Sequence, residues 1–402
     1  MVVNPPTKNP QASNPEKQSW IIRGYREGDE KQAVPLFNRI FNKSISEAHY
    51  RWKVIDSPWP SGTAPTWFAD ADGLIVGQYA STAMRLWLQG SEVPIVHVCD
   101  VMTHPDFRRQ GILSAIGETA HKTWQENGVK LVTGFPHKGW GSRSKYLNWQ
   151  TMYYSGWMWR PLRPGQLLGN RFQLPNFLTK TVDTAAHLVA NLKKPFSRTP
   201  AADITISEVE TPGPEFDTLW HKLKQSYEAT VVRDTAWVTY RYADAPEKEY
   251  RLLLARRNNI PAGYLAYRLR RLNDSPVAYI ADLFTARDDT ACRRALIQTA
   301  VDMVYDAGAK ACWRWRRPSN RSGKAFHKPD FIRDLVSSMS PSCRWRMICR
   351  WRSFVIPNAG FQWAAILILY NFIKRNDMPL RRSYSGIQRT VKASERRHIY
   401  SR

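Results

Sequence analysis

The sequence predicts an α+β protein with mixed sheets, in which two tandem domains share one fold and a basic tail follows them. The first observation is the length of 402 residues, which exceeds the usual size of one domain. The second is the composition, 43% apolar and 23% charged, which is typical of folded chains. The third is a set of landmarks that recurs after roughly 180–190 residues, which indicates an internal duplication.

The first copy begins after an N-terminal segment, residues 1–18, that we predict to be disordered. This segment has no apolar core, so no secretory signal is visible. A strand at 21–29 and a helix over 30–41 come next. The second copy opens in the same way, with a strand at 204–213 and a helix over 214–225.

Both copies continue with a hairpin, a further strand, a helix and a short strand. Each shared landmark is weak alone, and two unrelated α+β domains are the alternative, but the common order favours duplication. The matching pairs are the strands 66–70 and 251–256, the turns Asp72-Gly73 and Asn258-Asn259, the strand ends 77–80 and 263–266, the strands 98–103 and 280–285, and the helix-ending glycines Gly128 and Gly308.

These landmarks place the first domain at 19–160 and a second, degenerate domain at 203–340. The connector between them, 161–202, contains several prolines and an amphipathic helical pattern over 177–194. The tail, 341–402, matches neither copy.

The basic tail holds almost half of the formal net charge of +25. Three interpretations of it stay open. It could contact nucleic acid or an anionic membrane, it could be a solvated extension with one short helix at 361–373, or the reading frame could be disrupted after Ser340. The apolar stretch at 361–373 is too short for a membrane span, so we expect none.

The five cysteines contain no C-x-x-C pair, which excludes a disulfide scaffold and a cysteine-based zinc site. We therefore expect a reduced, cytoplasmic protein without a metal.

The sharpest local signal lies at 98–132, where a β-branched strand ends at Thr103 and a basic turn leads into a helix. The first N–H groups of a helix have no partner within it, and the helix dipole adds positive charge there. Gly111 in the turn would allow a ligand close to the backbone, and Arg108 and Arg109 add charge. The pattern suits a pyrophosphate, although an ordinary solvated helix start is the alternative.

The run Arg108-Arg109-Gln110-Gly111-Ile112-Leu113 resembles motif A of the GNAT acyltransferase superfamily, in which a strand leads into R/Q-x-x-G-x-G/A and a long helix. Leu113 stands where the family has a small residue. The order of strands and helices over 21–149 is also similar to that superfamily. The resemblance implies two tandem acyl-CoA N-acyltransferase-like domains, with acetyl-CoA or another acyl-CoA as co-substrate.

The resemblance also implies where this cofactor lies. Its pantetheine arm would add to the strand through backbone groups of Val101, Met102 and Thr103, and an N–H near Val101 would polarise the thioester carbonyl. Its pyrophosphate would bind the N–H groups of Arg109, Gln110, Gly111, Ile112, Leu113 and Ser114. The second copy has Asp288 and Asp289 at the matching turn, so we expect no cofactor there.

In GNAT chemistry a base removes a proton from the acceptor amine, and an acid protonates the departing thiolate. Asp100 and His97 are candidate bases on the strand, but Asp282 occupies the place of Asp100 in the copy without the cofactor turn, which favours a structural role for both aspartates. Cys99 should point to the other face from Asp100 and belong to the core. The candidate acid is Tyr146.

The leading hypothesis is an N-acyltransferase, most simply an N-acetyltransferase, whose acceptor is a small-molecule or peptide amine. A Fem-type aminoacyl transferase that uses aminoacyl-tRNA is one alternative, although the cofactor turn favours CoA. A non-catalytic nucleic-acid-binding protein on the same scaffold is the other, with nucleic acid contacted through the tail.

Overall fold

The protein is described by a computed structural model, and the residues that it describes are 19–59, 66–135, 147, 149–150, 156–192, 203–246, 250–272, 275–316 and 347–348. The expectations for residues 1–18, for most of the basic tail and for Tyr146 lie outside these ranges. No helix in the described ranges is long and apolar enough to cross a membrane. The same ranges contain no cluster of three or more His, Cys, Asp or Glu side chains placed to hold a metal ion.

The first sheet has eight strands, in the order β1-β2-β3-β4-β5-β14-β6, and β9 pairs with β3 beside this path. Its central strands are antiparallel, and β5 lies parallel to β4. The strands are β1 (Ile21–Gly24), β2 (Thr66–Ala71), β3 (Leu74–Leu88), β4 (Ser91–Thr103), β5 (Leu131–Gly134), β6 (Trp149–Gln150), β9 (Ala229–Val231) and β14 (Met347–Ile348).

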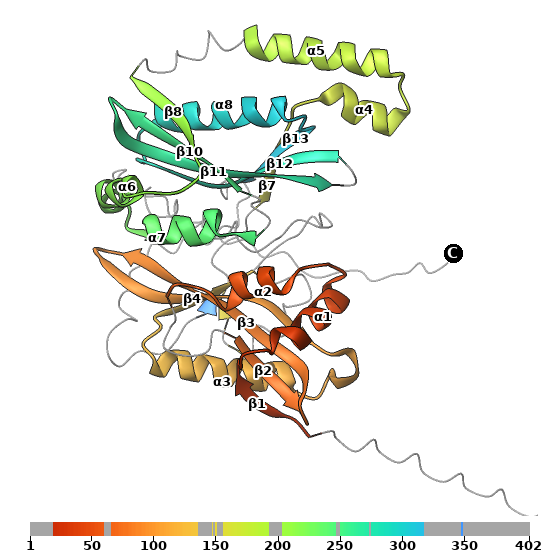
Figure 1. The fold of residues 1–402 in the computed structure, drawn as a ribbon, viewed down its shortest axis with the longest axis vertical. Helices are drawn as coiled ribbons and strands as arrows, with labels where there is room; N and C mark the ends of the chain where they lie inside the picture. Colours follow the sequence, from red (N-terminus) through yellow and green to blue (C-terminus); the bar gives the residue numbers. More distant parts are fainter. Residues whose placement is uncertain are drawn as a thin grey trace, which may run out of the picture. The chain divides into compact units, whose positions relative to one another are not determined.

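Helices cover both faces of this sheet (Figure 1). On one face, α1 (Glu30–Phe41) and α2 (Glu47–Val54) bury a cluster that includes Phe37 and Cys99. On the other face, α3 (Ile112–Glu126) packs Ile116 and Trp124 against the sheet. Because both faces are covered, the core strands are apolar on both sides, and β3 is buried along nearly its whole length.

The second sheet has six strands, in the order β7-β13-β12-β11-β10-β8. Its strands are β7 (Gly156–Pro161), β8 (Ile204–Val209), β10 (Tyr250–Arg257), β11 (Ile260–Leu272), β12 (Ser275–Thr285) and β13 (Ala311–Arg316). The helix α8 (Thr290–Asp306) covers one face, and α6 (Glu215–Leu223) and α7 (Thr235–Val238) lie on the other (Figure 1). The strands and helices of this second sheet follow one another in an order similar to that of the first sheet.

The predicted domain limits differ from the strand pairing at two places. We expected the first domain to extend to residue 160, but β7 pairs antiparallel with β13 of the second sheet. Conversely β9, from the expected second domain, pairs with β3 of the first sheet, with Leu86 opposite Val231. Each strand covers an edge whose N–H and C=O groups would otherwise face solvent, and such edges favour pairing with any available strand.

The connector forms a helical hairpin, α4 (Pro164–Phe172) and α5 (Asn176–Leu192). The amphipathic pattern over 177–194 therefore predicted α5 correctly, to within two residues at its C-terminal end. No pattern in the sequence marked α4.

Candidate active site

The strand β4 contains a β-bulge where the sequence analysis placed the cofactor and catalytic residues. Ala80 of β3 faces Cys99, but Gln78 faces Met102, so Asp100 and Val101 together oppose Tyr79. The Asp100 backbone has φ of 45°, which is unusual for a residue with a side chain. A bulge of this kind bends the strand and removes one residue from the hydrogen-bonding ladder.

β4 and β5 separate just before this bulge. Their parallel pairing runs from Ile95 opposite Leu131 to Val98 opposite Gly134, and β4 continues past it to Thr103. The Val101–Thr103 backbone therefore extends beyond the register of β5, on the side where β5 would pair with it. An extended ligand could add to such an edge through main-chain hydrogen bonds.

Side chains from β3 and α2 hold the bulge in place. The Gln78 side-chain N–H donates to the main-chain carbonyl oxygen of Asp100 at 2.9 Å. The side-chain oxygen of Gln78, Oε1, accepts from the Tyr50 hydroxyl at 2.7 Å. Gln78 and Tyr50 are fully buried. This network holds the left-handed Asp100 backbone, because the buried Gln78 amide binds its carbonyl oxygen and the buried Tyr50 hydroxyl holds Gln78 in turn.

The Asp100 carboxylate forms an ion pair with Lys53 of α2, with 2.5 Å between Nζ and Oδ2. Both side chains are about nine-tenths buried, at 10% and 7% exposure. Lys53 also lies over the Phe37 ring, in the cluster that contains Cys99. Asp100 and Cys99 therefore reach the same face, and the prediction that they alternate was wrong, because the bulge interrupts the two-residue period of the strand.

Cys99 is buried, as predicted, and burial raises the pKa of its thiol. His97 is 2% exposed, and its Nδ1 lies 2.9 Å from the Thr133 hydroxyl. Burial, followed by the charge of Lys53, lowers the pKa of His97 to about 4. The ring is therefore neutral at physiological pH and, as a weak base packed in the core, is poorly suited to remove a proton from an amine.

The basic turn directly follows the C-terminal end of β4, a few residues beyond the bulge. Gly111 is the N-cap of α3 with φ of 83°, and no side chain caps this helix end. Arg108, Arg109 and Gly111 are exposed, and Arg109 also has a left-handed backbone, with φ of 65°. The helix therefore presents its first N–H groups to solvent beside two arginines, which is the arrangement that binds phosphate in many proteins.

A second glycine sets the position of this helix start. A Cβ atom on Gly77 of β3 would lie 2.6 Å from Ile112 Cγ2, in the first turn of α3. Gly77 faces Thr103 across the sheet, at the end of the strand that leads into the turn. Because Gly77 has no side chain, the first turn of α3 can pack directly against β3.

In the second sheet, the N-terminus of the corresponding helix, α8, is capped by the side chain of its N-cap residue. Asp289, the N-cap of α8, accepts from the Cys292 N–H at 2.9 Å, and its carboxylate is held by Arg257 at 3.0 Å. In β12 the register also skips one residue, Ala281, but Asp282 there is buried and accepts from Arg233 at 2.9 Å. A carboxylate thus occupies the N-terminus of α8, whereas the N-terminus of α3 has no side-chain cap.

The predicted residues Val101 to Thr103 and Arg108 to Ser114 thus lie along one strand edge and the helix start that follows it. Tyr146 is outside the described residues. Sequence reasoning missed Tyr50, Lys53 and Gln78, which shape the bulge. No motif marks them, because they lie 22 or more residues from Asp100 and meet it only through packing.

Residues 21–146 match the family model described as Acetyltransferase (GNAT) domain. A conserved protein of unknown function from Enterococcus faecalis, titled a probable N-acyltransferase, superposes with a TM-score of 0.52 at 12% identity, over 74% of this chain and 65% of that one. No curated protein matches the sequence.

Two further structures share the fold. A GCN5-related N-acetyltransferase from Anabaena variabilis has a TM-score of 0.51 at 14% identity and covers 74% of this chain and 66% of that one. Another from Kribbella flavida has 0.51 at 13% identity, with 77% and 67% covered. The chain thus spans just under two thirds of the length of the first two structures.

Proposed function

We propose an N-acyltransferase activity for this protein, from the premise that residues 21–146 match the GNAT acetyltransferase domain. The acyl group would come from acyl-CoA, with acetyl-CoA as the simplest donor, and the acceptor would be an amine. The observation that carries the proposal is the continuity of one strand edge with one open helix start, from the bulge at Asp100 and Val101 to Gly111.

The donor would lie along β4. Backbone groups of Val101, Met102 and Thr103 continue beyond β5 and would bind the pantetheine arm as an added strand. Val101 lies in the bulge, and its N–H would polarise the thioester carbonyl. The pyrophosphate would bind N–H groups of the turn and of the first turn of α3, and Arg108 and Arg109 would add charge.

The acceptor amine would attack the thioester carbon directly, lose a proton, and expel CoA as a thiolate that is then protonated. We propose Tyr146 as the acid. Asp100, the candidate base, is held in a buried ion pair with Lys53 of α2. We therefore assign Asp100 chiefly to positioning the bulge, with the base among residues that approach the acceptor.

A calorimetric titration with acetyl-CoA tests the donor site. Gly111→Asp places a side chain on a left-handed backbone and a negative charge beside the phosphates, so affinity should fall by more than about tenfold. Gly308→Asp is the matched control, because Gly308 also has φ of 83° and open space around it, but ends α8. Wild-type protein that binds neither acetyl-CoA nor longer acyl-CoA would contradict the proposal, as would equal losses in both variants.

The two alternative functions predict different results in the same assay. An aminoacyl transferase would bind aminoacyl-tRNA and ignore acyl-CoA. A nucleic-acid-binding protein would bind polynucleotide with an affinity that falls steeply with salt, and Gly111→Asp would leave that affinity unchanged. The open turn favours the CoA donor over both.

A further inference from the structure

The helical hairpin of the connector, α4 and α5, is built with its polar groups inside and its apolar groups outside. Thr179 and Asp183 of α5 are 6% and 4% exposed. Asp183 faces α4 and accepts from the Gly165 N–H at 2.6 Å. The apolar side chains instead face solvent: Leu168 at 44% exposure, Phe172 at 65%, Phe177 at 68%, Leu178 at 43%, Val182 at 40%, Leu188 at 58% and Val189 at 49%.

Small residues allow the two helices to approach closely. A Cβ atom on Gly165 would lie 2.0 Å from the Thr179 carbonyl oxygen, and one on Gly169 would lie 2.5 Å from Thr179 Cγ2. The two glycines are four residues apart, which is the G-x-x-x-G spacing of helices that pack through their backbones in lipid. The hairpin therefore holds together without its large apolar side chains, which stay available for another surface.

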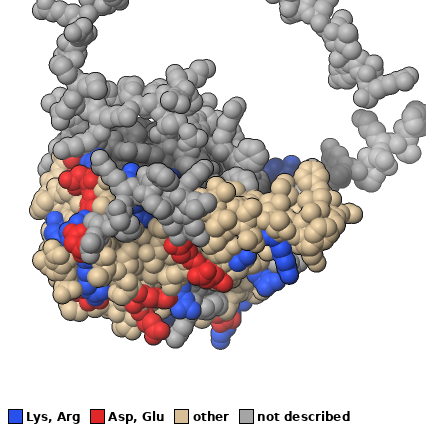
Figure 2. All heavy atoms as spheres, turned by 90° about the horizontal axis from the view of Figure 1, so that it is seen from above, with Lys and Arg blue, Asp and Glu red and all other residues tan. Residues whose placement is uncertain are grey.

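The exposed apolar residues of α5 gather on one face. Leu178, Val182 and Val189 repeat at helical spacing, and Phe177 and Leu188 extend the same face. The one acid of α5, Asp183, points away from this face into the hairpin. Figure 2, viewed from the side on which α5 lies in Figure 1, shows a broad area without charged side chains that is bordered by Lys and Arg and, along another part of its edge, by Asp and Glu.

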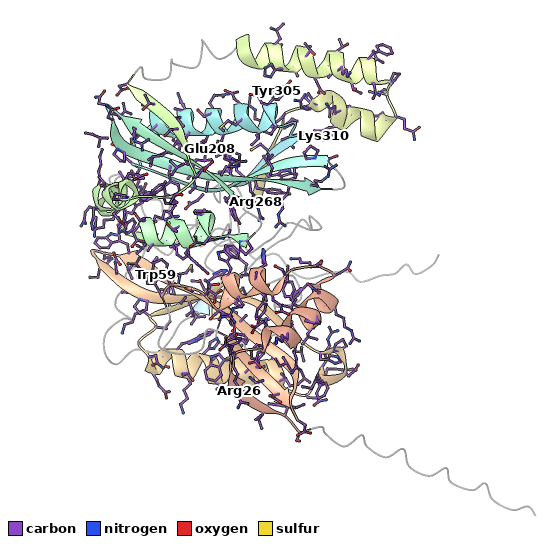
Figure 3. All side chains as sticks on the ribbon, viewed as in Figure 1. Arg26, Trp59, Glu208, Arg268, Tyr305 and Lys310 are labelled. Atoms are coloured by element: carbon purple, nitrogen blue, oxygen red, sulfur yellow. The ribbon has the colours of Figure 1, made fainter. Side chains whose placement is uncertain are left out.

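The hairpin is fixed on the second unit at the end of α8. The Arg163 guanidinium lies 4.2 Å from the centre of the Tyr305 ring and donates to the Tyr305 carbonyl oxygen at 2.9 Å. His187 of α5 stacks on the same ring at 4.2 Å. Tyr305 is labelled in Figure 3, where α4 and α5 lie on the side of α8 away from the sheet. These contacts use the inner face of α5 and leave its apolar face outward.

The charge of this segment indicates which surface the face suits. The sequence of the connector, 161–202, contains six Lys and Arg residues and a single acid, Asp183, which is turned inward. Among the described side chains, Lys180 of α5 is exposed, whereas Arg163 contacts Tyr305. An apolar helix face with flanking cations and no outward acid is typical of helices that lie in the interface of an anionic bilayer. A second copy of the chain would carry the same positive charge and would oppose this pairing electrostatically.

We propose that the outer face of the α4–α5 hairpin docks on an anionic lipid bilayer and holds the protein at the membrane surface. The helices would lie in the headgroup region with the apolar side chains inserted, and the cations would contact lipid phosphates. The proposal does not depend on the acyl-CoA donor, because the hairpin and the strand edge of β4 have no residue in common.

Flotation with lipid vesicles tests it, using phosphatidylcholine alone and phosphatidylcholine mixed with phosphatidylglycerol. The full chain should float with the mixed vesicles, and the triple variant Phe177→Gln, Val182→Gln, Leu188→Gln should bind at least about tenfold more weakly. The matched control replaces Ile21, Leu74 and Ile260, which are 63%, 51% and 53% exposed elsewhere, by Gln and should bind like wild type.

Two outcomes would overturn the proposal. In the first, wild type ignores both kinds of vesicle, or the triple variant floats as well as wild type. In the second, wild type is a dimer that the triple variant dissociates while neither binds lipid, so that another copy covers this face. Hydrogen exchange adds a measurement that needs no variant: mixed vesicles should slow exchange of the 176–192 amides, and unchanged exchange there would also contradict docking.

Discussion

At the scale of single residues, the ion pair between Lys53 and Asp100 has the clearest structural consequence. Asp100 interrupts β4 with a left-handed backbone, and its carbonyl and carboxylate are each bound by a side chain from another element. A buried carboxylate is tolerated only when its charge is compensated. The same pair that shapes the strand edge is therefore a point of vulnerability for folding.

Lys53→Met should destabilise the protein by about 3 kcal/mol, because it leaves the Asp100 carboxylate buried without its cation. Adding Asp100→Asn should recover part of this loss, since the remaining group is neutral. Urea unfolding of wild type, both single variants and the double variant would measure the coupling. A double variant no more stable than Lys53→Met would show that the pair is not coupled.

Among the described residues, the buried histidines His97 and His121 should make stability dependent on pH. Burial lowers the pKa of His97 and of His121 to about 4, below the usual 6.5. Between these values the unfolded chain binds protons that the folded protein does not, so stability is full above about pH 6.5 and falls as the pH drops toward 4.

Replacing both histidines by Gln should flatten this dependence, as measured by urea unfolding at several pH values. His221→Gln, on the exposed side of α6, should leave the slope unchanged. If the double variant keeps the wild-type slope, other groups control the acid response.

At the scale of elements, the N-termini of α3 and α8 differ. Both helices follow a strand with a bulge, and both start next to a glycine of the neighbouring strand. Gly77 lies under the first turn of α3, and Gly263 takes the same place under α8, where a Cβ atom would be 3.1 Å from Cys292 Sγ. The α3 start has no side-chain cap, whereas α8 is capped by Asp289. One helix start can accept an anion, and the other already holds a carboxylate.

Asp289→Ala should lower the stability of the protein by about 1 kcal/mol, because α8 loses its N-cap. It should leave acetyl-CoA binding unchanged, with one molecule bound per chain in wild type and variant. Thermal unfolding and calorimetric stoichiometry are the measurements. A wild-type stoichiometry of two, or a loss of binding in the variant, would contradict the assignment of the donor to the first copy alone.

At the scale of the whole molecule, each sheet includes one strand from the part of the chain that builds the other sheet. β7 precedes the connector but completes the second sheet, and β9 follows it but extends the first. Side chains add to this connection: the Trp52 indole N–H donates to the Tyr240 carbonyl at 2.7 Å, and the Tyr240 hydroxyl donates to the Trp52 carbonyl at 2.8 Å. Neither sheet is complete without a strand from the other part of the chain.

Heating should therefore unfold both sheets in one cooperative transition, because the loss of either one exposes a strand edge of the other. Differential scanning calorimetry with tryptophan fluorescence would measure this. Two separate transitions, or a calorimetric enthalpy far above the van't Hoff enthalpy, would show that the sheets unfold independently.

Local sequence patterns were sufficient to predict several features of the structure. The mixed α/β fold class followed from the order of strands, turns and helices, and the helix α5 followed from its apolar spacing. The uncapped helix start at Gly111 followed from Arg and Gly before an apolar helical pattern. These features depend on neighbours within one or two turns of chain, so the sequence carries them directly.

Only the tertiary structure decided the rest, because those features depend on residues far apart in the chain. The sequence alone predicted the mixed α/β fold class and a helix start at Gly111 that follows two exposed arginines. The folded structure decided that Asp100 turns to the face of Cys99 and meets Lys53, and that β7 and β9 join each other's sheets. It also decided that α5 buries Asp183 and exposes its apolar face. An amphipathic pattern gives the two faces of a helix, but only packing against a partner determines which of them meets solvent.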